Sequence, residues 1–291
     1  MLKMYPCLDS AEMAMSRRQE LDIPRNVAAA LGRSAVEAVV KGYYVCRAGA
    51  KVDWSRDVYA ACSAKVSIPP GASLLARESI TFPETQVQVT NETTLGASRR
   101  LVERGLKPLA LNFANGIHPG GGFLGGARAQ EEVLCRSSAL YQTLAGDPMY
   151  EHHLKRPRPD STAWVIYSPD VPVFRTDDGS AFGDPWLLSF ITCAAPYAPA
   201  IGQPEAGDLL RGRIHRVLAF ARAYGYGTLV LGAWGCGAFG NDAHRTAIDF
   251  RQVLEDEFNG TFSDIVFAIA DWSPERRFLG PFCGAFAPNE R

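Results

Sequence analysis

The stretch that decides the fold is residues 109–141, which read LALNFANGIHPGGGFLGGARAQEEVLCRSSALY. Its first five residues, Leu109 to Phe113, form an apolar run with the length and flanking residues of a buried strand. A glycine-rich loop follows, and three of its glycines are consecutive: Gly120, Gly121 and Gly122. Because these residues carry no β-carbon, a ligand can lie directly against their backbone amides, and the chain can take positive φ there. The pattern therefore predicts a strand that ends in a ligand-binding loop.

Three polar residues stand at the far end of this loop: Gln130, Glu131 and Glu132. They open a segment whose apolar residues recur at helix-compatible spacing. Adjacent glutamates in the first turn of a helix are most often solvated residues that the helix dipole favours. Here they follow a loop of bare amides, which favours a role in binding or catalysis. A pair of carboxylates can hold ribose hydroxyls and transfer protons.

A second glycine-rich loop lies within residues 229–241, LVLGAWGCGAFGN, between a strand candidate and a helix candidate. It satisfies the G-x-G-x-x-G pattern, in which amides at the start of a helix approach a diphosphate. The motif by itself is weak, and a tight strand-to-helix turn explains it equally well. Its aromatic residue could serve either as a face for a base or as part of the core. The residues of this candidate diphosphate site are Gly235, Cys236, Gly237, Ala238, Phe239 and Gly240.

A nicotinamide-dependent oxidoreductase is the alternative that this second motif raises. In that fold the motif belongs to the first βαβ unit of the domain, with a ribose-binding acid roughly 20 residues further on. Only one clear strand candidate, residues 265–270, follows the motif here. We therefore expect the two glycine-rich loops to face each other across one ligand. Amides for a diphosphate, an aromatic face and two carboxylates together describe ADP-ribose.

Strand and helix candidates alternate through most of the remaining chain. Apolar spacing and flanking turn residues predict helices over residues 24–42, 91–104, 205–224 and 243–258, and strands over residues 87–90, 163–167, 189–193, 228–231 and 265–270. This alternation predicts an α/β fold in which helices cover both faces of a mixed or mostly parallel sheet. Residues 1–23 are polar, and we expect them to be only partly ordered. Asn91 is a candidate N-cap, and residues 152–160 are expected to form an exposed basic loop.

Composition narrows the classes of function. The 291 residues are 47% hydrophobic and carry a net charge of −1, so we expect no direct binding to nucleic acid or to a membrane. Seven cysteines are scattered without a C-x-x-C pair, which predicts reduced, mostly buried thiols and a cytoplasmic protein. No His or Cys spacing matches a zinc pattern, so we expect no metal. The first residues show no charged-then-apolar pattern and no uninterrupted apolar run approaches 18 residues, so we expect a soluble protein without a leader or a membrane span.

The combination of motifs resembles one family. Gly120-Gly121-Gly122, seven further residues and then Gln130-Glu131-Glu132 match the GGG-X6-8-QEE signature of poly(ADP-ribose) glycohydrolases. The surrounding segments NFANGIHPGGGFLGGARAQEE, LCR, YSPDVPVFR and LGAWGCGAFGN are similar to those of the short, bacterial-type members. The resemblance covers about Val87 to Asp271. It favours a hydrolase over an oxidoreductase.

The resemblance implies a macrodomain, an α/β/α sandwich around a mixed sheet. We expect an N-terminal helical extension over residues 1–80, packed on a catalytic domain over residues 81–291, with one globular unit overall. The implied activity releases ADP-ribose from poly(ADP-ribose) and ADP-ribosylated proteins, without a cofactor and as a monomer. A reader that binds ADP-ribose without cleaving it is the alternative. Retention of both glutamates favours the enzyme, because a reader needs no proton donor.

The resemblance also implies roles for particular residues. Glu132 matches the catalytic glutamate, Glu131 the neighbour that holds ribose hydroxyls, and Gln130 the residue that positions them. Substrate contacts are expected from Asn115, Gly120, Gly121 and Gly122, and diphosphate contacts from Gly235 to Gly240, with Phe239 near the adenosine. One departure is His118, which stands where family members often have asparagine before the proline; no role is carried over to it.

Overall fold

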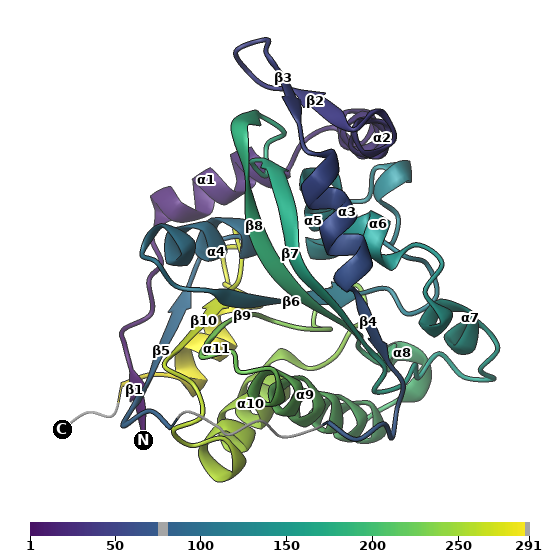
Figure 1. Cartoon of the computed structure of the whole chain (residues 1–291). Coiled ribbons are helices and arrows are strands. Elements are labelled where there is room, and N and C mark those ends of the chain that lie inside the picture. Colours follow the sequence, from purple (N-terminus) through teal and green to yellow (C-terminus); the bar gives the residue numbers. More distant parts are fainter. Residues whose placement is uncertain (75–80, 289–291) are drawn as a thin grey trace.

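An eight-stranded sheet forms the centre of the molecule (Figure 1). The protein is described here by a computed structural model that covers residues 1–74 and 81–288. The described residues form the strands β1 (Leu2–Met4), β2 (Tyr43–Val45), β3 (Lys51–Asp53), β4 (Val66–Ile68), β5 (Thr85–Thr90), β6 (Pro108–Ala114), β7 (Val165–Arg175), β8 (Ala181–Ala194), β9 (Thr228–Leu231) and β10 (Asp264–Ala268). All of them except β2 and β3 belong to the central sheet. The sheet order is β1-β5-β10-β9-β6-β8-β7-β4. Its pairs are parallel except where β7 meets β8 and β4, and β2 pairs with β3 in a separate hairpin.

Helices cover both faces of this sheet (Figure 1). They are α1 (Ala11–Leu21), α2 (Arg25–Lys41), α3 (Ser55–Ala64), α4 (Thr94–Glu103), α5 (Gln130–Ser137), α6 (Leu140–Leu144), α7 (Pro148–Leu154), α8 (Ala198–Ile201), α9 (Glu205–Ala223), α10 (Ala243–Glu257) and α11 (Leu279–Ala285), with a 3₁₀ turn η1 (Phe123–Gly125). Within the described ranges, none of these helices has the length and apolar character needed to cross a membrane.

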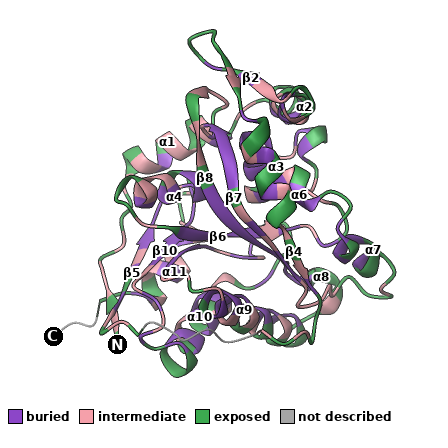
Figure 2. Cartoon of the chain, in the orientation of Figure 1, coloured by how far each residue is buried: buried purple, intermediate pink, exposed green. Residues whose placement is uncertain are grey.

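Two apolar cores lie on opposite faces of the sheet. Leu109 and Leu111 of β6 belong to the core under α9, α10 and α11, whereas Ala110 belongs to the core under α2 to α6. Successive strand residues point to opposite faces, so a strand with a core on each side is apolar along most of its length. This explains the continuous apolar run at the start of the deciding stretch. The central strands are buried along their length (Figure 2), and the predicted α/β/α sandwich is confirmed.

The sheet opens between two of its central strands. β6 pairs with β9 only over Pro108 to Ala110, but it pairs with β8 as far as Ala114. The carboxyl half of β6 therefore has a strand partner on one side only. In open α/β sheets, ligands bind outside the carboxyl ends of the strands where neighbouring strands separate. The opening between β6 and β9 is such a place.

The first 23 residues are more ordered than their sequence suggests. Leu2 to Met4 add β1 to the edge of the sheet beside β5, and Ser10 caps α1 by accepting a hydrogen bond from Met13 N at 3.1 Å. The prediction of partial order is wrong because a strand that pairs with a distant segment leaves little local signal. β4 joins the opposite edge of the sheet. The proposed boundary at residue 80 falls among residues 75–80, outside the described ranges, and stays a proposal.

Two further predictions need correction. The segment 152–160 is only partly an exposed loop, because His153 is buried at the end of α7, with its ring nitrogens 3.0 Å from Gly116 O and 2.7 Å from Thr162 Oγ1. The thiols are not all reduced either, because Cys7 and Cys283 form a disulfide between the segment after β1 and α11. These cysteines are 276 positions apart, and only the fold brings them together. The other five cysteines are free.

Candidate active site

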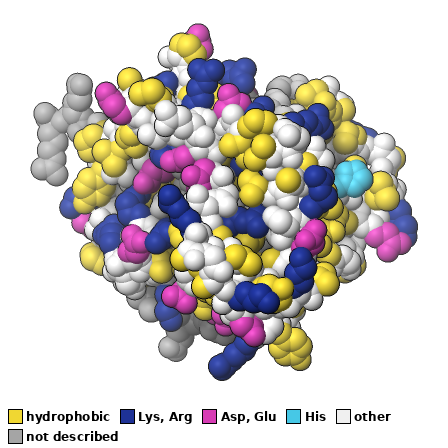
Figure 3. Space-filling model, turned by 90° about the horizontal axis from the view of Figure 1, so that it is seen from above, with side chains coloured by type: hydrophobic (Ala, Val, Ile, Leu, Met, Phe, Trp, Pro, Cys, Tyr) yellow, Lys and Arg dark blue, Asp and Glu magenta, His cyan; other side chains and the backbone are white. Residues whose placement is uncertain are grey.

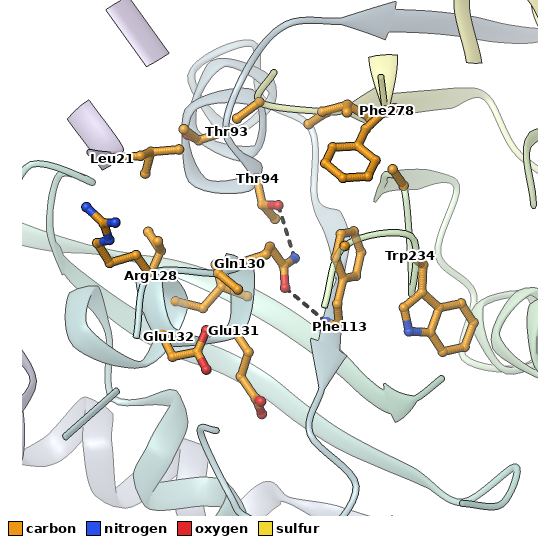
Figure 4. Close-up of a pocket in the computed structure, with 18 of the residues that line it drawn as sticks. Leu21, Thr93, Thr94, Phe113, Arg128, Gln130, Glu131, Glu132, Trp234 and Phe278 are labelled. Carbon is orange, nitrogen blue, oxygen red and sulfur yellow. Dashed lines mark hydrogen bonds between the residues drawn. The ribbon is translucent and has the colours of Figure 1, made fainter. Parts of the chain in front are cut away.

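A pocket of about 380 Å³ lies at the carboxyl ends of β6, β9 and β10. Asn115 follows β6, Trp234 and Phe239 follow β9, and Ile269 follows β10, and all four line the pocket. The beginnings of α4 and α5 supply a further wall (Figure 4). On the face seen in Figure 3, acidic and basic side chains are intermingled. The strand opening is thus a formed cavity, and charged side chains such as those of Glu92, Arg128 and Asp177 line it.

The two glutamates of α5 are buried in the pocket wall, with exposed fractions of 3% for Glu131 and 8% for Glu132. Glu131 Oε2 accepts a hydrogen bond from Asn115 N at 2.7 Å, and its Oε1 accepts one from Asn112 Nδ2 at 3.3 Å. Glu132 Oε1 accepts one from Gly122 N at 3.0 Å. Backbone amides before and within the glycine-rich loop therefore hold the two carboxylates that the same stretch carries.

The consecutive glycines are required by this close approach. Gly120 and Gly121 have φ of 71° and 57°, in the left-handed region that favours glycine. A β-carbon on Gly121 would lie 2.3 Å from Glu132 Oε1 and 3.1 Å from Glu131 Oε2. The loop thus rests directly on both acids. Asn115 and the acids line the pocket at this point. Gly120, Gly121 and Gly122 are not in its lining, so their predicted contact with substrate stays a prediction, and Gly121 lies directly against both acids.

Burial raises the pKa of Glu131 to about 8. The hydrogen bond from Asn115 N opposes this rise in pKa, and the nearby charge of Glu132 adds to it. At neutral pH the pair therefore carries less than two full negative charges, which relieves their mutual repulsion. The neighbouring Cys135 is fully buried, and burial raises its thiol pKa well above the ordinary value. That agrees with a packing role for Cys135, because the thiolate is the nucleophilic form.

The second glycine-rich loop forms the other side of the pocket. Gly235, Gly237, Ala238 and Phe239 line it, while Cys236 and Gly240 are in the loop but not in its lining. Asn241 Nδ2 holds the loop by donating to Gly235 O at 3.1 Å and to Pro196 O at 2.9 Å. Phe239 is half-buried, with its ring 6.1 Å from that of Tyr197. The second loop and the two acids thus line one cavity, which the first glycine-rich loop reaches only through Asn115 at its start and Arg128 at its end.

Gln130 joins α5 to the free edge of β6. Its Oε1 accepts from Phe113 N at 2.9 Å, and its Nε2 donates to Leu111 O at 2.7 Å and to Thr94 Oγ1 at 3.1 Å (Figure 4). The two backbone groups lie beyond Ala110, where β9 no longer pairs with β6. The Gln130 amide therefore replaces a strand neighbour. Its proposed contact with substrate remains a prediction, and its observed contacts position the helix that carries the acids.

Replacing Gln130 with alanine is expected to lower the free energy of unfolding by about 2 kcal/mol or more, because Leu111 O and Phe113 N lose their partner. Urea denaturation measures this change. Gln252→Ala is the matched control: Gln252 is exposed and accepts only from Arg211, so a change within about 0.5 kcal/mol is expected. Equal losses in the two variants would show that Gln130 does not hold the edge of β6.

Other residues of the pocket were not recognised in the sequence. They include Leu21, Thr93, Asp177, Trp272 and Phe278. Thr93, not Asn91, caps α4, since its Oγ1 accepts from Gly96 N at 2.9 Å. Asn91 instead ties β5 to the segment after β10, with Nδ2 donating to Asp271 O at 2.7 Å. Thr93 and its neighbours follow the carboxyl end of β5, and this position after a strand is the one sequence signal that could have indicated them as pocket residues. Among the described residues, no three His, Cys, Asp or Glu side chains gather as metal ligands.

The sandwich fold and the pocket at the strand ends define a macrodomain-like protein, and two amide-held carboxylates lie in the wall of its pocket. The chain belongs to the microbial-type poly(ADP-ribose) glycohydrolase (PARG) family. The model of the microbial-type PARG catalytic domain matches residues 32–176. The resemblance seen in the sequence is confirmed, and the match begins within α2, well before Val87.

Solved structures support the same assignment. PARG from Thermomonospora curvata, bound to the inhibitor ADP-HPD, is 39% identical with a TM-score of 0.82, and the match covers 90% of this chain and 100% of that one. PARG from Deinococcus radiodurans in complex with ADP-ribose is 40% identical with a TM-score of 0.74, covering 79% of this chain and 97% of that one. No curated protein sequence matches the chain.

Proposed function

We propose that this protein is a poly(ADP-ribose) glycohydrolase, which hydrolyses the ribose–ribose O-glycosidic bond and releases ADP-ribose. Family membership supports this activity. The observation that carries it is the pair Glu131 and Glu132, buried and held by amides of their own loop, in the wall of the pocket that the second glycine-rich loop lines. The related Deinococcus enzyme holds ADP-ribose in its solved structure, and the same ligand suits this pocket.

The proposed placement of ADP-ribose follows the chemistry of the walls. Its diphosphate lies against the amides of Gly235, Gly237 and Ala238, near the start of α10, whose dipole favours an anion. The distal ribose then lies at the two glutamates, across the opening between β9 and β6. Glu131 holds the ribose hydroxyls, and Phe239 offers an aromatic face toward the adenosine.

Glu132 is proposed to act as acid and then as base. It donates a proton to the departing 2′-oxygen as the bond from that oxygen to the ribose C1″ breaks, leaving an oxocarbenium-like sugar. Water then attacks C1″, and its proton returns to Glu132. The nearby diphosphate stabilises the positive charge on the sugar. Each turnover thus restores the protonated acid.

Incubation of the purified protein with automodified poly(ADP-ribose) polymerase tests this function. We expect free ADP-ribose to accumulate and the polymer to shorten, both resolved by anion-exchange chromatography. Polymer that is bound by the protein but not shortened would assign the fold to a reader of ADP-ribose. ADP-ribosylated proteins are the proposed partners in either case.

A further inference from the structure

The first glycine-rich loop contacts the beginning of α2 as well as the two acids. A β-carbon on Gly32 of α2 would lie 2.7 Å from Phe123 O and 3.0 Å from the Phe123 ring. Arg25 Nε donates to Gly125 O at 2.9 Å. A β-carbon on Gly126 would lie 2.1 Å from Arg25 O, and Gly126 has φ of 82°. The loop therefore approaches α2 closely at both ends of the turn η1.

A third contact joins the end of this loop to the turn between α1 and α2. Arg128 Nη1 donates to Asp22 Oδ1 at 2.7 Å and to Ile23 O at 2.8 Å. Residues 22–33, called the N-terminal support below, thus contact the loop from η1 to its end. The contact also reaches the pocket, because Leu21 and Arg128 both line it (Figure 4).

The backbone hydrogen bonds within this part of the loop are short-range. Gly125 N donates to Gly122 O at 3.0 Å, and Gly126 N donates to Phe123 O at 3.2 Å. Such bonds fix the local shape of a turn, whereas its place in the molecule depends on contacts with other elements. The N-terminal support supplies such contacts on one side of the turn, and α5 supplies them on the other.

Phe123 connects the N-terminal support to the acids. Its side chain is buried, and its ring contacts Gly32 of α2 with one edge and Gly120 of the loop with the other, since a β-carbon on either glycine would lie 3.0 Å from the ring. Phe123 directly follows Gly122, whose N donates to Glu132 Oε1 at 3.0 Å. A displacement of Phe123 is therefore passed to the amide that holds Glu132 across a single peptide bond.

We propose that the N-terminal support belongs to the catalytic site, and that Gly32 and Arg25 are positioning residues that hold Glu132 in place through the first glycine-rich loop. This proposal rests on the proposed function, in which Glu132 transfers the proton. Neither positioning residue lines the pocket, so each acts through the loop. The match to the family model begins at residue 32, so the support extends the site to residues before that match.

Gly32→Ala tests the contact with Phe123. The added β-carbon must push the turn away from α2, and a displacement of about 1 Å in a catalytic group can cost roughly 10²-fold in rate. We expect kcat for polymer shortening to fall by about tenfold or more, while KM and the dissociation constant of ADP-ribose change by less than about threefold. Calorimetry with ADP-ribose also counts the binding sites, so kcat can be expressed per site that binds.

Gly212→Ala is the matched control for this substitution. Gly212 is an exposed glycine inside α9, and a β-carbon there meets nothing within 4 Å. Both changes replace a helical glycine by a better helix former. Only the Gly32 variant should lose rate per binding site.

Arg25→Met and Arg25→Lys test the second contact without adding a group to the loop. Methionine keeps an apolar stem but cannot donate to Gly125 O, so kcat should fall by about threefold at unchanged affinity for ADP-ribose. Lysine can still donate, and its kcat should stay within about twofold of that of the wild type. This pair of variants decides the proposal if Gly32→Ala does not fold.

A wild-type kcat per binding site in Gly32→Ala would overturn the proposal. A loss of rate that only equals the loss of binding sites would overturn it too, because unfolding alone would then explain the loss. With the Arg25 variants, equal kcat values for methionine and lysine would have the same consequence. Wild-type protein that releases no ADP-ribose from polymer would instead overturn the proposed function, so the two failures are distinct.

Discussion

Glu132→Gln is expected to lower kcat for polymer shortening by about 10³-fold or more, with little change in the affinity for ADP-ribose. The amide oxygen of glutamine can still accept from Gly122 N, as Glu132 Oε1 does at 3.0 Å, so the loop should keep its place. Glutamine cannot donate the proton to the leaving oxygen or take one from water. Acid–base catalysis of one step is worth about 10² to 10⁴ in rate, and here both steps are lost.

Single-turnover kinetics with defined polymer measure the chemical step, and calorimetry with ADP-ribose measures binding. A change in affinity below about threefold, together with the loss of rate, would place the effect in the transition state. Glu255→Gln, which alters an exposed carboxylate paired with Arg251, should keep the wild-type rate. If the Glu132 variant shortened polymer at near the wild-type rate, another group would have to move the proton.

Much of the fold could be predicted because its signals are local. The apolar run from Leu109 to Phe113 indicates a strand buried on both faces, and the helix over residues 243–258 is indicated by its own apolar spacing. The glycine loop and the two glutamates are neighbours in sequence, so their meeting needs only a tight turn. The meeting with the second loop is inferred from chemistry. The pocket is lined by the second loop and by the two acids, whereas the three consecutive glycines are not in its lining.

Other features depend on contacts between segments far apart in sequence, and no local pattern indicates them. β1 pairs with residues more than 80 positions away, and Leu21 reaches the pocket only because α1 packs over it. From its sequence, Arg136 would be expected on the surface of α5. It is buried because the turn that contains Asp177 packs against it. The sequence predicts a substrate contact for Gln130 and gives no sign of its hydrogen bonds to β6. Those bonds are needed because β6 separates from β9, and this separation is a property of the whole sheet.

Gly121→Ala is expected to lower kcat by about 10²-fold or more without abolishing folding. The new β-carbon would lie 2.3 Å from Glu132 Oε1, so the loop or the acid must move. Gly121 also has φ of 57°, a region that costs an alanine about 1 kcal/mol or more. A displacement of about 1 Å in a catalytic group can cost roughly 10²-fold in rate. Binding of ADP-ribose should weaken as well, because Glu131 Oε2 would be only 3.1 Å from the added carbon.

Gly125→Ala in the same loop is the matched control for this substitution. A β-carbon there meets nothing within 4 Å, and Gly125 does not have positive φ. Both variants should have similar circular dichroism, and only the Gly121 variant should lose activity in the assay of ADP-ribose release. Equal activity in the two would mean that the carboxylates do not depend on the loop for their position. A rate loss confined to the Gly121 variant would instead show that the missing β-carbon of Gly121 leaves the space that the Glu132 carboxylate occupies. This requirement explains why the signature joins consecutive glycines to a pair of acids.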